Sequence, residues 1–324
     1  KTWGFSICPV RMQTTQISEV IRFYNQFESS RHQLPFDVDG LVVKIDSFEN
    51  QQILGVTAKS PRWAIAFKYP APQATTTVKK ITFSVGRSGI VTPVAELVPV
   101  PCAGVIISNA TLHNFDEIKR LGVRENDTVI IERAGEVIPK IIKVVEHKGA
   151  QEVLPPKECP SCKGTISKEE DEVGYYCMNP ACPAQLRARL LHFASRDAMD
   201  IEGMGDVVTD QLLAKNYISD FADIYGLSFL HLLQLENFKE KKAQNLLNAI
   251  EASKQKPLSK LLFALGIAFV GEKTAEILAD HFHTMDALQQ ASLEALQNVP
   301  EVGEKVSKSI YDFFRNPRAA EQIE

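Results

Sequence analysis

The sequence carries Cys159-Pro160-Ser161-Cys162 and Cys177-Met178-Asn179-Pro180-Ala181-Cys182, two cysteine pairs with the spacing C-x2-C-x14-C-x4-C. Each pair can supply two thiolates to one side of a tetrahedron, and soft sulfur ligands favour zinc. Four protein sulfurs leave no ligand position for water, so the predicted Zn²⁺ site is structural. Two disulfides or four free thiols are the alternative. The surrounding module, residues 151–186, has little apolar content and therefore little reason to fold without a metal.

The segment before this module, residues 71–150, has a β character. Short runs rich in β-branched residues are interrupted by glycine and proline, and about five strands are expected: Thr75–Val78, Ile81–Val85, Ile90–Thr92 with Val94–Val98, Thr128–Glu132 and Val137–Val145, with a turn at Ala134-Gly135. Short strands in this length favour a small barrel, with the oligonucleotide-binding (OB) fold as the leading candidate. Cys8 and Cys102, outside the quartet, are expected to be buried small hydrophobes.

Residues 1–70 mix helix and strand. The apolar spacing of Gln16–Phe27 predicts a surface helix, and Leu41–Ile45 and Trp63–Tyr69 predict strands. Lys44 and Lys68 end these apolar strands. Taken separately, each is an ordinary rim lysine; together, they could converge on a phosphate inside a cleft.

Residues 187–324 predict short helices and no strand. A turn of the form hydrophobic-x-Gly-hydrophobic-Gly recurs before amphipathic helices, which is the helix-hairpin-helix signature. Glycines let the turn backbone approach a phosphate, and a helix N-terminus presents free N–H groups. The expected DNA-binding glycines are Gly203, Gly205, Gly266, Gly271 and Gly303. The turn before Phe238–Ile250 lacks both glycines and the turn at Val299 lacks one, so a role in packing alone is the alternative for these two turns.

The totals are those of a globular protein with several domains. The 324 residues are 44% hydrophobic and 23% charged. The net charge of -4 does not indicate nucleic-acid binding, but phosphate contacts depend on local patches rather than on the total. The longest apolar stretch, Leu261–Gly271, is far too short to span a bilayer, so no membrane association is expected.

Several stretches, in this order, resemble the bacterial NAD-dependent DNA ligases. Those that look like nucleotidyltransferase motifs IV and V are Arg31 with Leu34–Lys44, and Pro61–Pro70. Those that resemble the hallmarks of the family's barrel are Val85–Gly89, Ser108–Asn114 and Arg133–Pro139. The cysteine quartet and the hairpin array follow in the family's order.

The resemblance implies a multidomain α+β protein. Residues 1–70 would be the C-terminal part of a nucleotidyltransferase (adenylation) domain, 71–150 an OB-fold, 151–186 a four-cysteine zinc finger and 187–324 an all-α helix-hairpin-helix domain. Such ligases transfer AMP from NAD to a lysine and then to the 5′-phosphate of a nick, where the 3′-hydroxyl displaces it. NAD, Mg²⁺ (or Mn²⁺) and Zn²⁺ are the implied cofactors. Nicked duplex DNA is the implied partner of a cytoplasmic, nucleoid-associated monomer.

The resemblance also implies roles for individual residues. Lys44 and Lys68 would touch the adenylate, and Asp39 and Arg31 would support its pocket or the nick phosphate. The expected DNA contacts in the barrel are Arg87, Asn109, Thr111 and His113.

The sequence departs from the family pattern because the nucleophilic lysine is absent: no Lys-x-Asp-Gly tetrapeptide occurs, and Asp39-Gly40 follows Asp37-Val38. The amino-terminal nicotinamide-binding module, the adenine-binding half of the domain and the C-terminal BRCT domain are also missing. We therefore expect a portion of a ligase. The alternatives are a non-catalytic zinc-containing repair scaffold and an ATP-dependent ligase, which does not as a rule carry this quartet and hairpin array.

Overall fold

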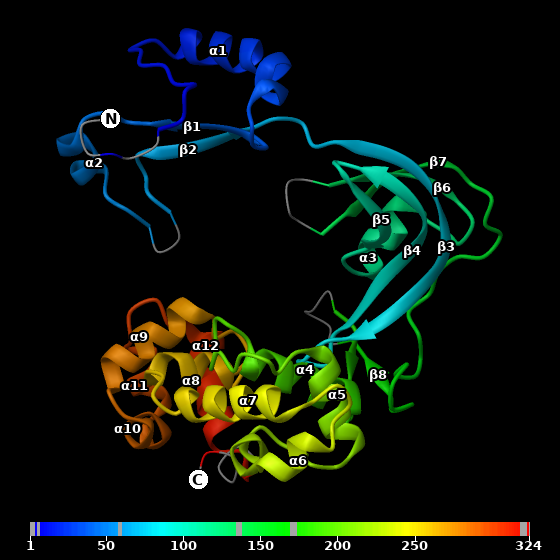
Figure 1. Cartoon of the computed structure of the whole chain (residues 1–324), viewed down its shortest axis with the longest axis vertical. Helices are drawn as coiled ribbons and strands as arrows, with labels where there is room; N and C mark the ends of the chain where they lie inside the picture. The colour runs from blue at the N-terminus through cyan, green and yellow to red at the C-terminus, as the bar shows by residue number, and fades with distance from the viewer. Residues whose placement is uncertain are drawn as a thin grey trace.

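The computed structural model describes residues 4, 7–57, 60–133, 138–168, 174–317 and 323. The chain follows an open arc, with a small strand-and-helix unit at one end, a β-barrel in the middle and a helical domain at the other end (Figure 1). Within the described part of the chain, no helix is long and apolar enough to cross a membrane.

The amino-terminal unit consists of α1 (Ile17–Ser30), the 3-10 helix η1 (Arg31–Gln33), β1 (Gly40–Lys44), α2 (Phe48–Leu54) and β2 (Ala64–Lys68). The antiparallel strands β1 and β2 form a two-stranded sheet. One face of this sheet packs against α1, where Tyr24 stacks on Phe67 at 3.7 Å between ring centroids. Only glycine fits at position 40, where β1 begins opposite Lys68 of β2, because a Cβ there would lie 2.6 Å from the Phe67 carbonyl oxygen.

The middle unit is a closed barrel with the strand order β3-β4-β5-β7-β6. Its elements are β3 (Gln73–Val85), β4 (Val91–Cys102), β5 (Val105–Thr111), α3 (Phe115–Leu121), β6 (Thr128–Glu132) and β7 (Lys140–Glu146). Helix α3 lies between the third and fourth strands of this closed barrel. This architecture confirms the predicted OB-fold. Alternating side chains fill the interior, among them Val78, Leu97 and Ile131, each at most 2% exposed.

The barrel strands differ in detail from the sequence prediction. Thr75–Val78 and Ile81–Val85 form one strand that bends at a bulge between Val78 and Lys80. Strand β4 likewise continues through three prolines, one of which, Pro101, pairs with Ile106. The sequence predicts a strand break at Pro93, but this residue pairs with Phe83, whereas Pro99 lies at a register shift between Glu96 and Val100. The predicted turn at Ala134-Gly135 lies outside the described residues.

A buried carboxylate closes the barrel near its exit toward the cysteines. Asp127, which is 0% exposed, accepts hydrogen bonds from the backbone N–H groups of Arg124 (2.9 Å), Lys148 (2.8 Å) and Gly149 (3.0 Å), and contacts His147 Nδ1 at 3.0 Å. Burial opposes ionisation, but the hydrogen bonds from Gly149 and Lys148 outweigh it and hold the pKa of Asp127 below its ordinary value.

The zinc-finger module and the helical domain share a continuous helix. The module contains the short strands β8 (Ile166–Ser167) and β9 (Tyr176–Cys177), and α4 (Pro183–Ala194) begins directly after its last cysteine. Helix α4 therefore runs across the boundary predicted at residue 186. The boundaries at residues 70, 150 and 186 remain predictions.

The helical domain has one hydrophobic core and is all-α over its described residues. After α4 come α5 (Asp206–Ala214), η2 (Ala222–Gly226), α6 (Phe229–Leu233), α7 (Glu240–Ser253), α8 (Leu258–Ala264), α9 (Glu272–Phe282), α10 (Met285–Gln290), α11 (Leu293–Gln297) and α12 (Glu304–Phe314). Four helix pairs pack closely, α4 with α5, α6 with α7, α8 with α9 and α11 with α12. A short turn joins the helices of the last three pairs, whereas a longer segment, residues 195–205, joins α4 to α5.

Replacing Asp127 by Asn should lower the free energy of unfolding by about 2 kcal/mol at neutral pH, because one acceptor oxygen and the charge are lost while buried donors remain. The folded-state pKa of Asp127 is lowered, so its contribution is complete above the ordinary carboxyl pKa and is lost as pH falls through the folded value. Urea unfolding of both proteins at several pH values tests this. A stability difference that did not shrink in acid would contradict the assignment.

Candidate zinc centre and nucleic-acid interface

The four cysteine sulfurs form a compact cluster. Their Sγ atoms all lie within 4.8 Å of one another, with 3.8 Å between Cys159 and Cys182 and 3.5 Å between Cys162 and Cys177. A tetrahedral zinc ion with Zn–S bonds of about 2.3 Å requires S–S edges of about 3.8 Å. A disulfide requires about 2.05 Å, so the pairs are not disulfides. Three of the cysteines are buried and Cys162 is half-buried, so the donor set fits a closed structural Zn²⁺ site.

The local backbone prepares the cluster for a cation. The N–H of Gly164 donates to Sγ of Cys162 at 3.4 Å and, with the Asn179 side chain, lowers the pKa of that thiol to about 6. Burial raises the pKa of Cys177 to about 12. A bound zinc ion would hold both as thiolates and compensate the buried negative charge.

The cysteine module is hydrogen-bonded to the turn between β3 and β4. The N–H of Cys177 donates to the Gly89 carbonyl at 2.8 Å, and the N–H of Val91 donates to the Tyr175 carbonyl at 2.7 Å. Gly89 has a φ of +87°, and a Cβ there would lie 2.9 Å from the Cys177 carbonyl oxygen. The buried Gln185 side chain also donates to that carbonyl, at 3.0 Å. Cys177, one of the four predicted zinc ligands, is thus part of the contact between the cysteine module and the barrel.

On its other side the module continues into the helical domain. Cys182 is the N-cap of α4. Near the end of α4, His192 Nε2 lies 2.7 Å from the Phe263 carbonyl of α8. Burial lowers the pKa of His192, which favours the neutral ring as a hydrogen-bond donor here, and the nearby charge of Arg87 acts in the same direction. Arg87, in the β3–β4 turn, therefore lies where barrel and helical domain meet. Tyr175, Gln185 and His192 were not predicted from the sequence.

The four turns of the helical domain have the same backbone conformation. In each, a residue with positive φ comes two positions before the helix N-cap: Gly203 (92°) before Gly205, Asn237 (60°) before Lys239, Phe269 (64°) before Gly271 and Glu301 (64°) before Gly303. The turn without glycines is therefore equivalent to the others. Asn, unlike most residues, readily adopts positive φ.

The turns also share their packing. The residue four positions after each N-cap donates its N–H to the N-cap carbonyl and is 0% exposed: Thr209, Ala243, Ala275 and Ser307. All are small, which lets the two helices of each pair approach closely. The sequence contains this signal, because a small residue stands four positions after the N-cap in each of the four repeats.

Gly266, one of the glycines expected in the turns, does not occupy the position equivalent to Gly203. Gly266 follows the end of α8 with a φ of +67°, in the position where glycine commonly ends a helix. Phe269 occupies the position equivalent to Gly203. DNA contacts at the glycines of the turns remain predictions.

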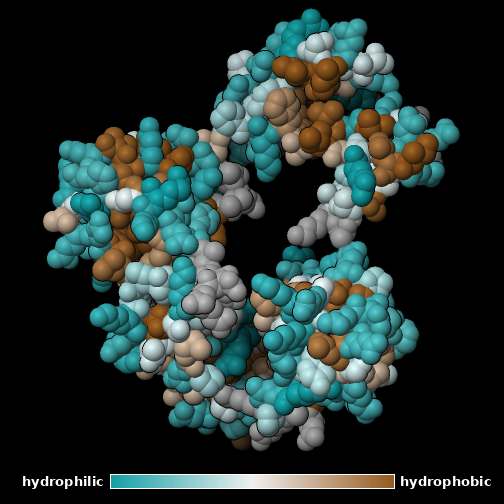
Figure 2. All heavy atoms as spheres, turned by 180° about the vertical axis from the view of Figure 1, so that it is seen from behind, coloured by the Kyte–Doolittle hydropathy of each residue, from teal (hydrophilic) through white to brown (hydrophobic). Residues whose placement is uncertain are grey.

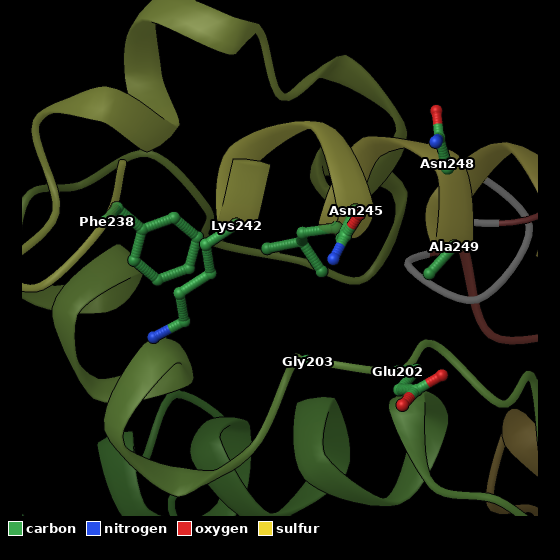
Figure 3. A pocket seen from close by; sticks show the side chains of 8 residues that line it. Glu202, Gly203, Phe238, Lys242, Asn245, Asn248 and Ala249 are labelled. Carbon is green, nitrogen blue, oxygen red and sulfur yellow. The ribbon is translucent and has the colours of Figure 1, made fainter. Parts of the chain in front are cut away.

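A groove of about 470 Å³ separates the first turn from α7 (Figure 3). It is lined by Glu202 and Gly203 on one side and by Lys242, Asn245 and Asn248 on the other. Lys242 Nζ lies 4.2 Å from the centre of the Phe238 ring. The groove thus brings polar side chains of the second helix pair beside the backbone of the first turn.

The predicted nucleotide-pocket residues lie in the amino-terminal unit. Lys44 and Lys68 occupy the same exposed face of the two-stranded sheet as Val42 and Ala66, opposite α1. The strand register pairs Gly40 with Lys68 and Lys44 with Ala64, so the lysines lie at opposite ends of the sheet, about 13 Å apart along the strands.

The acid and arginine expected beside the lysines are close to Lys68. Lys68 Nζ lies 3.0 Å from Asp39 Oδ2, and this pairing lowers the pKa of Asp39. The Arg31 guanidinium lies over the Tyr69 ring at 4.8 Å. The structure therefore brings Asp39 together with Lys68 but does not bring Lys44 to them.

The predicted barrel contacts lie at the end of β5. Asn109 is exposed and Thr111 is half-buried, with Oγ1 of Thr111 accepting from the His113 N–H at 3.1 Å. His113 has a φ of +56° and is exposed.

Of the two cysteines outside the quartet, Cys102 is buried as predicted, whereas Cys8 is exposed, so the prediction for Cys8 was wrong. Val10, two residues further on, packs on the small core of the amino-terminal unit, whereas Cys8 does not.

Four family models match successive parts of the chain. They describe an NAD-dependent DNA ligase adenylation domain (residues 1–72), an NAD-dependent DNA ligase OB-fold domain (75–153), an NAD-dependent DNA ligase C4 zinc finger domain (158–184) and a helix-hairpin-helix motif (260–323). The order is the one that the sequence predicted.

Curated relatives match nearly the whole chain. A DNA ligase of Endomicrobium trichonymphae is 52% identical over 314 residues, which are 97% of this chain and 46% of the relative. DNA ligases of Geobacter sulfurreducens (46% identical, 99% of this chain, 48% of the relative) and Bacillus cytotoxicus (48% identical, 97% and 47%) are similar. The chain thus spans about half the length of the curated relatives it matches. Because three domains of NAD-dependent DNA ligases follow one another along it and these relatives match nearly all of it, the chain belongs to the NAD-dependent DNA ligase family.

Proposed function

We propose that this chain is the DNA-holding portion of an NAD-dependent DNA ligase that seals nicks in duplex DNA. The observation that carries the proposal is the continuous succession of ligase adenylation, OB-fold and zinc-finger domains, followed by helix pairs. In the complete enzyme a lysine would take AMP from NAD, pass it to the 5′-phosphate, and the 3′-hydroxyl would then displace it. Monomeric action in the bacterial cytoplasm, at the nucleoid, is part of the proposal.

The exposed face of the β1–β2 sheet is the proposed contribution to the nucleotide pocket. Phosphorus gathers negative charge during nucleotidyl transfer, so fixed cations lower the barrier. Lys44 and Lys68 would bind the adenylate phosphate from two sides, which suits their separation along the sheet. Asp39 would hold the Lys68 ammonium in place through their 3.0 Å contact. Mg²⁺ (or Mn²⁺) would add positive charge at the phosphates, and Arg31 would support the pocket or the nick phosphate.

The DNA duplex would lie against the inner side of the arc. The space-filling view shows an opening bordered by the amino-terminal unit, the barrel and the helical domain (Figure 2). Arg87, Asn109, Thr111 and His113 would contact the DNA from the barrel. The turns of the helical domain would bind its phosphates through the free N–H groups at the starts of α5, α9 and α12, without reading sequence.

The zinc centre would act as a rigid joint between the two DNA-binding units. The supporting observation is the unbroken path from the barrel turn at Gly89, through Cys177, to Cys182 at the start of α4. A rigid joint presents both units to one duplex together, which raises affinity through effective concentration. Zinc itself would contact neither NAD nor DNA.

This chain should bind nicked duplex DNA but should not form a covalent adenylate, because it contains no Lys-x-Asp-Gly sequence to supply the nucleophile. Incubation with labelled NAD and Mg²⁺, followed by denaturing electrophoresis, measures adenylation. Radioactivity that stayed on the chain after denaturation would contradict the proposal.

In the full-length enzyme, Lys44→Ala or Lys68→Ala should each reduce nick sealing by at least about 100-fold, because a fixed charge at the reacting phosphate is lost. Arg22→Ala removes an exposed cation from the outer side of α1 and serves as the matched control. Ligation of a labelled nicked duplex is the measurement. Near-normal sealing by either lysine variant would exclude it from the pocket.

Gly89→Ala should weaken binding of nicked DNA by at least about tenfold while the chain keeps its zinc, because the added Cβ separates the barrel turn from Cys177. Gly104→Ala is the matched control: its φ is +75°, but nothing lies within 4 Å of the added Cβ. Cys177→Ser should lose zinc, thermal stability and DNA affinity together.

Zinc content, thermal unfolding and fluorescence anisotropy with a nicked duplex report the three quantities. The rigid-joint proposal would be abandoned if Gly89→Ala bound DNA as tightly as Gly104→Ala. It would also be abandoned if Cys177→Ser retained both stability and affinity.

A further inference from the structure

The third turn of the helical domain exposes an aromatic side chain. Phe269 is 61% exposed and has a φ of +64°. The equivalent positions in the other turns hold Gly203, Asn237 and Glu301. Gly and Asn adopt this conformation readily and Glu is at home in water, whereas Phe has neither property.

This position is unfavourable for Phe in two ways. A bulky residue in the left-handed region costs about 1–2 kcal/mol, and leaving an aromatic ring in water forgoes the stabilisation of burying it. Nothing in the described part of the helical domain offsets this, because Phe269 is not among the residues packed on its core, whereas the neighbouring Ile267 and Val270 are buried. A bulky residue that is held at positive φ without internal packing points to a function at this position.

The turn holds the ring in a fixed place. Ile267 and Val270, each 3% exposed, anchor the turn in the core. Ser309 Oγ of α12 donates to the Ala268 carbonyl at 2.8 Å, so the next helix pair braces the residue before Phe269. The ring is therefore presented from a rigid support, with little conformational entropy to lose on binding.

The surroundings of Phe269 suit the sugar-phosphate backbone of DNA. Gly271, the N-cap of α9, lies two residues further on, at most about 7 Å away. The acidic Glu272 in the first turn of α9 is ion-paired with Lys260, so its charge is compensated where a phosphate would approach. Phosphates alternate with apolar deoxyribose rings along a strand, so a phosphate at the N-terminus of α9 leaves a sugar within reach of Phe269.

We propose that Phe269 is a DNA-binding residue that packs on a deoxyribose beside a phosphate bound at the start of α9. The inference rests on the proposed DNA binding and adds to it an apolar contact in one turn out of four. Such a contact would add affinity that does not depend on salt, unlike the phosphate contacts around it.

The test compares this chain with Phe269→Asn, which tolerates positive φ, and with Phe269→Tyr, which keeps the ring. Leu230→Asn is the matched control, because Leu230 is 70% exposed within helix α6 and does not belong to a turn. Binding to a nicked duplex is measured by anisotropy at several salt concentrations, and thermal unfolding is measured in parallel.

We expect Phe269→Asn to bind on the order of tenfold more weakly at every salt concentration, with an unchanged slope of log affinity against log salt. Its thermal midpoint should rise, because Asn relieves the strain of the positive φ. Phe269→Tyr and Leu230→Asn should bind like the unmodified chain.

Equal affinity of Phe269→Asn and the unmodified chain would overturn the inference alone, and would direct the search to a protein partner for the ring. A thermal midpoint lowered in step with affinity would assign Phe269 to internal packing and would also overturn it. An unmodified chain that bound no duplex would overturn the proposed DNA binding together with this inference.

Discussion

The connection between the barrel, the cysteine module and the helical domain depends on one cysteine. Cys177 belongs to the sulfur cluster, its N–H donates to Gly89 in the barrel, and its carbonyl accepts from Gln185 on α4. Removing the metal would therefore free more than the loop between the cysteine pairs, since the same residue connects three units. In a module with so little apolar content, metal ligation supplies folding free energy that a hydrophobic core would supply elsewhere.

The four turns of the helical domain are alike because of their buried residues. Its four turns share one backbone conformation although their sequences differ, because the constraint lies in the buried hydrophobic residues and in the small residue four positions after each N-cap. The positive-φ position faces solvent and is free to vary. It holds Gly203, Asn237, Phe269 and Glu301, so function can be varied there at a modest cost in stability.

Sequence reasoning recovered the features set by local chemistry. The cysteine spacing predicted the cluster, the β-branched runs predicted the barrel, and the glycine turns predicted helix pairs. It failed where tertiary contacts decide: β4 continues through its prolines because β5 pairs with it, and Gly266 caps α8 rather than shaping the next turn. It also missed Asp127, Gln185 and His192, because single polar residues give no periodic signal and their partners are far away in sequence. The separation of Lys44 from Lys68 likewise follows from strand register, which each strand alone does not contain.

In the proposed function, the zinc centre makes the barrel and the helical domain hold one duplex as a unit. Hydroxyl-radical footprinting of this chain on a nicked duplex, before and after zinc is removed with a chelator, measures this coupling. We expect one continuous protected tract on both sides of the nick, which contracts to a shorter tract when zinc is removed and returns when zinc is restored. A footprint of unchanged length in the zinc-free protein would rule out the rigid joint.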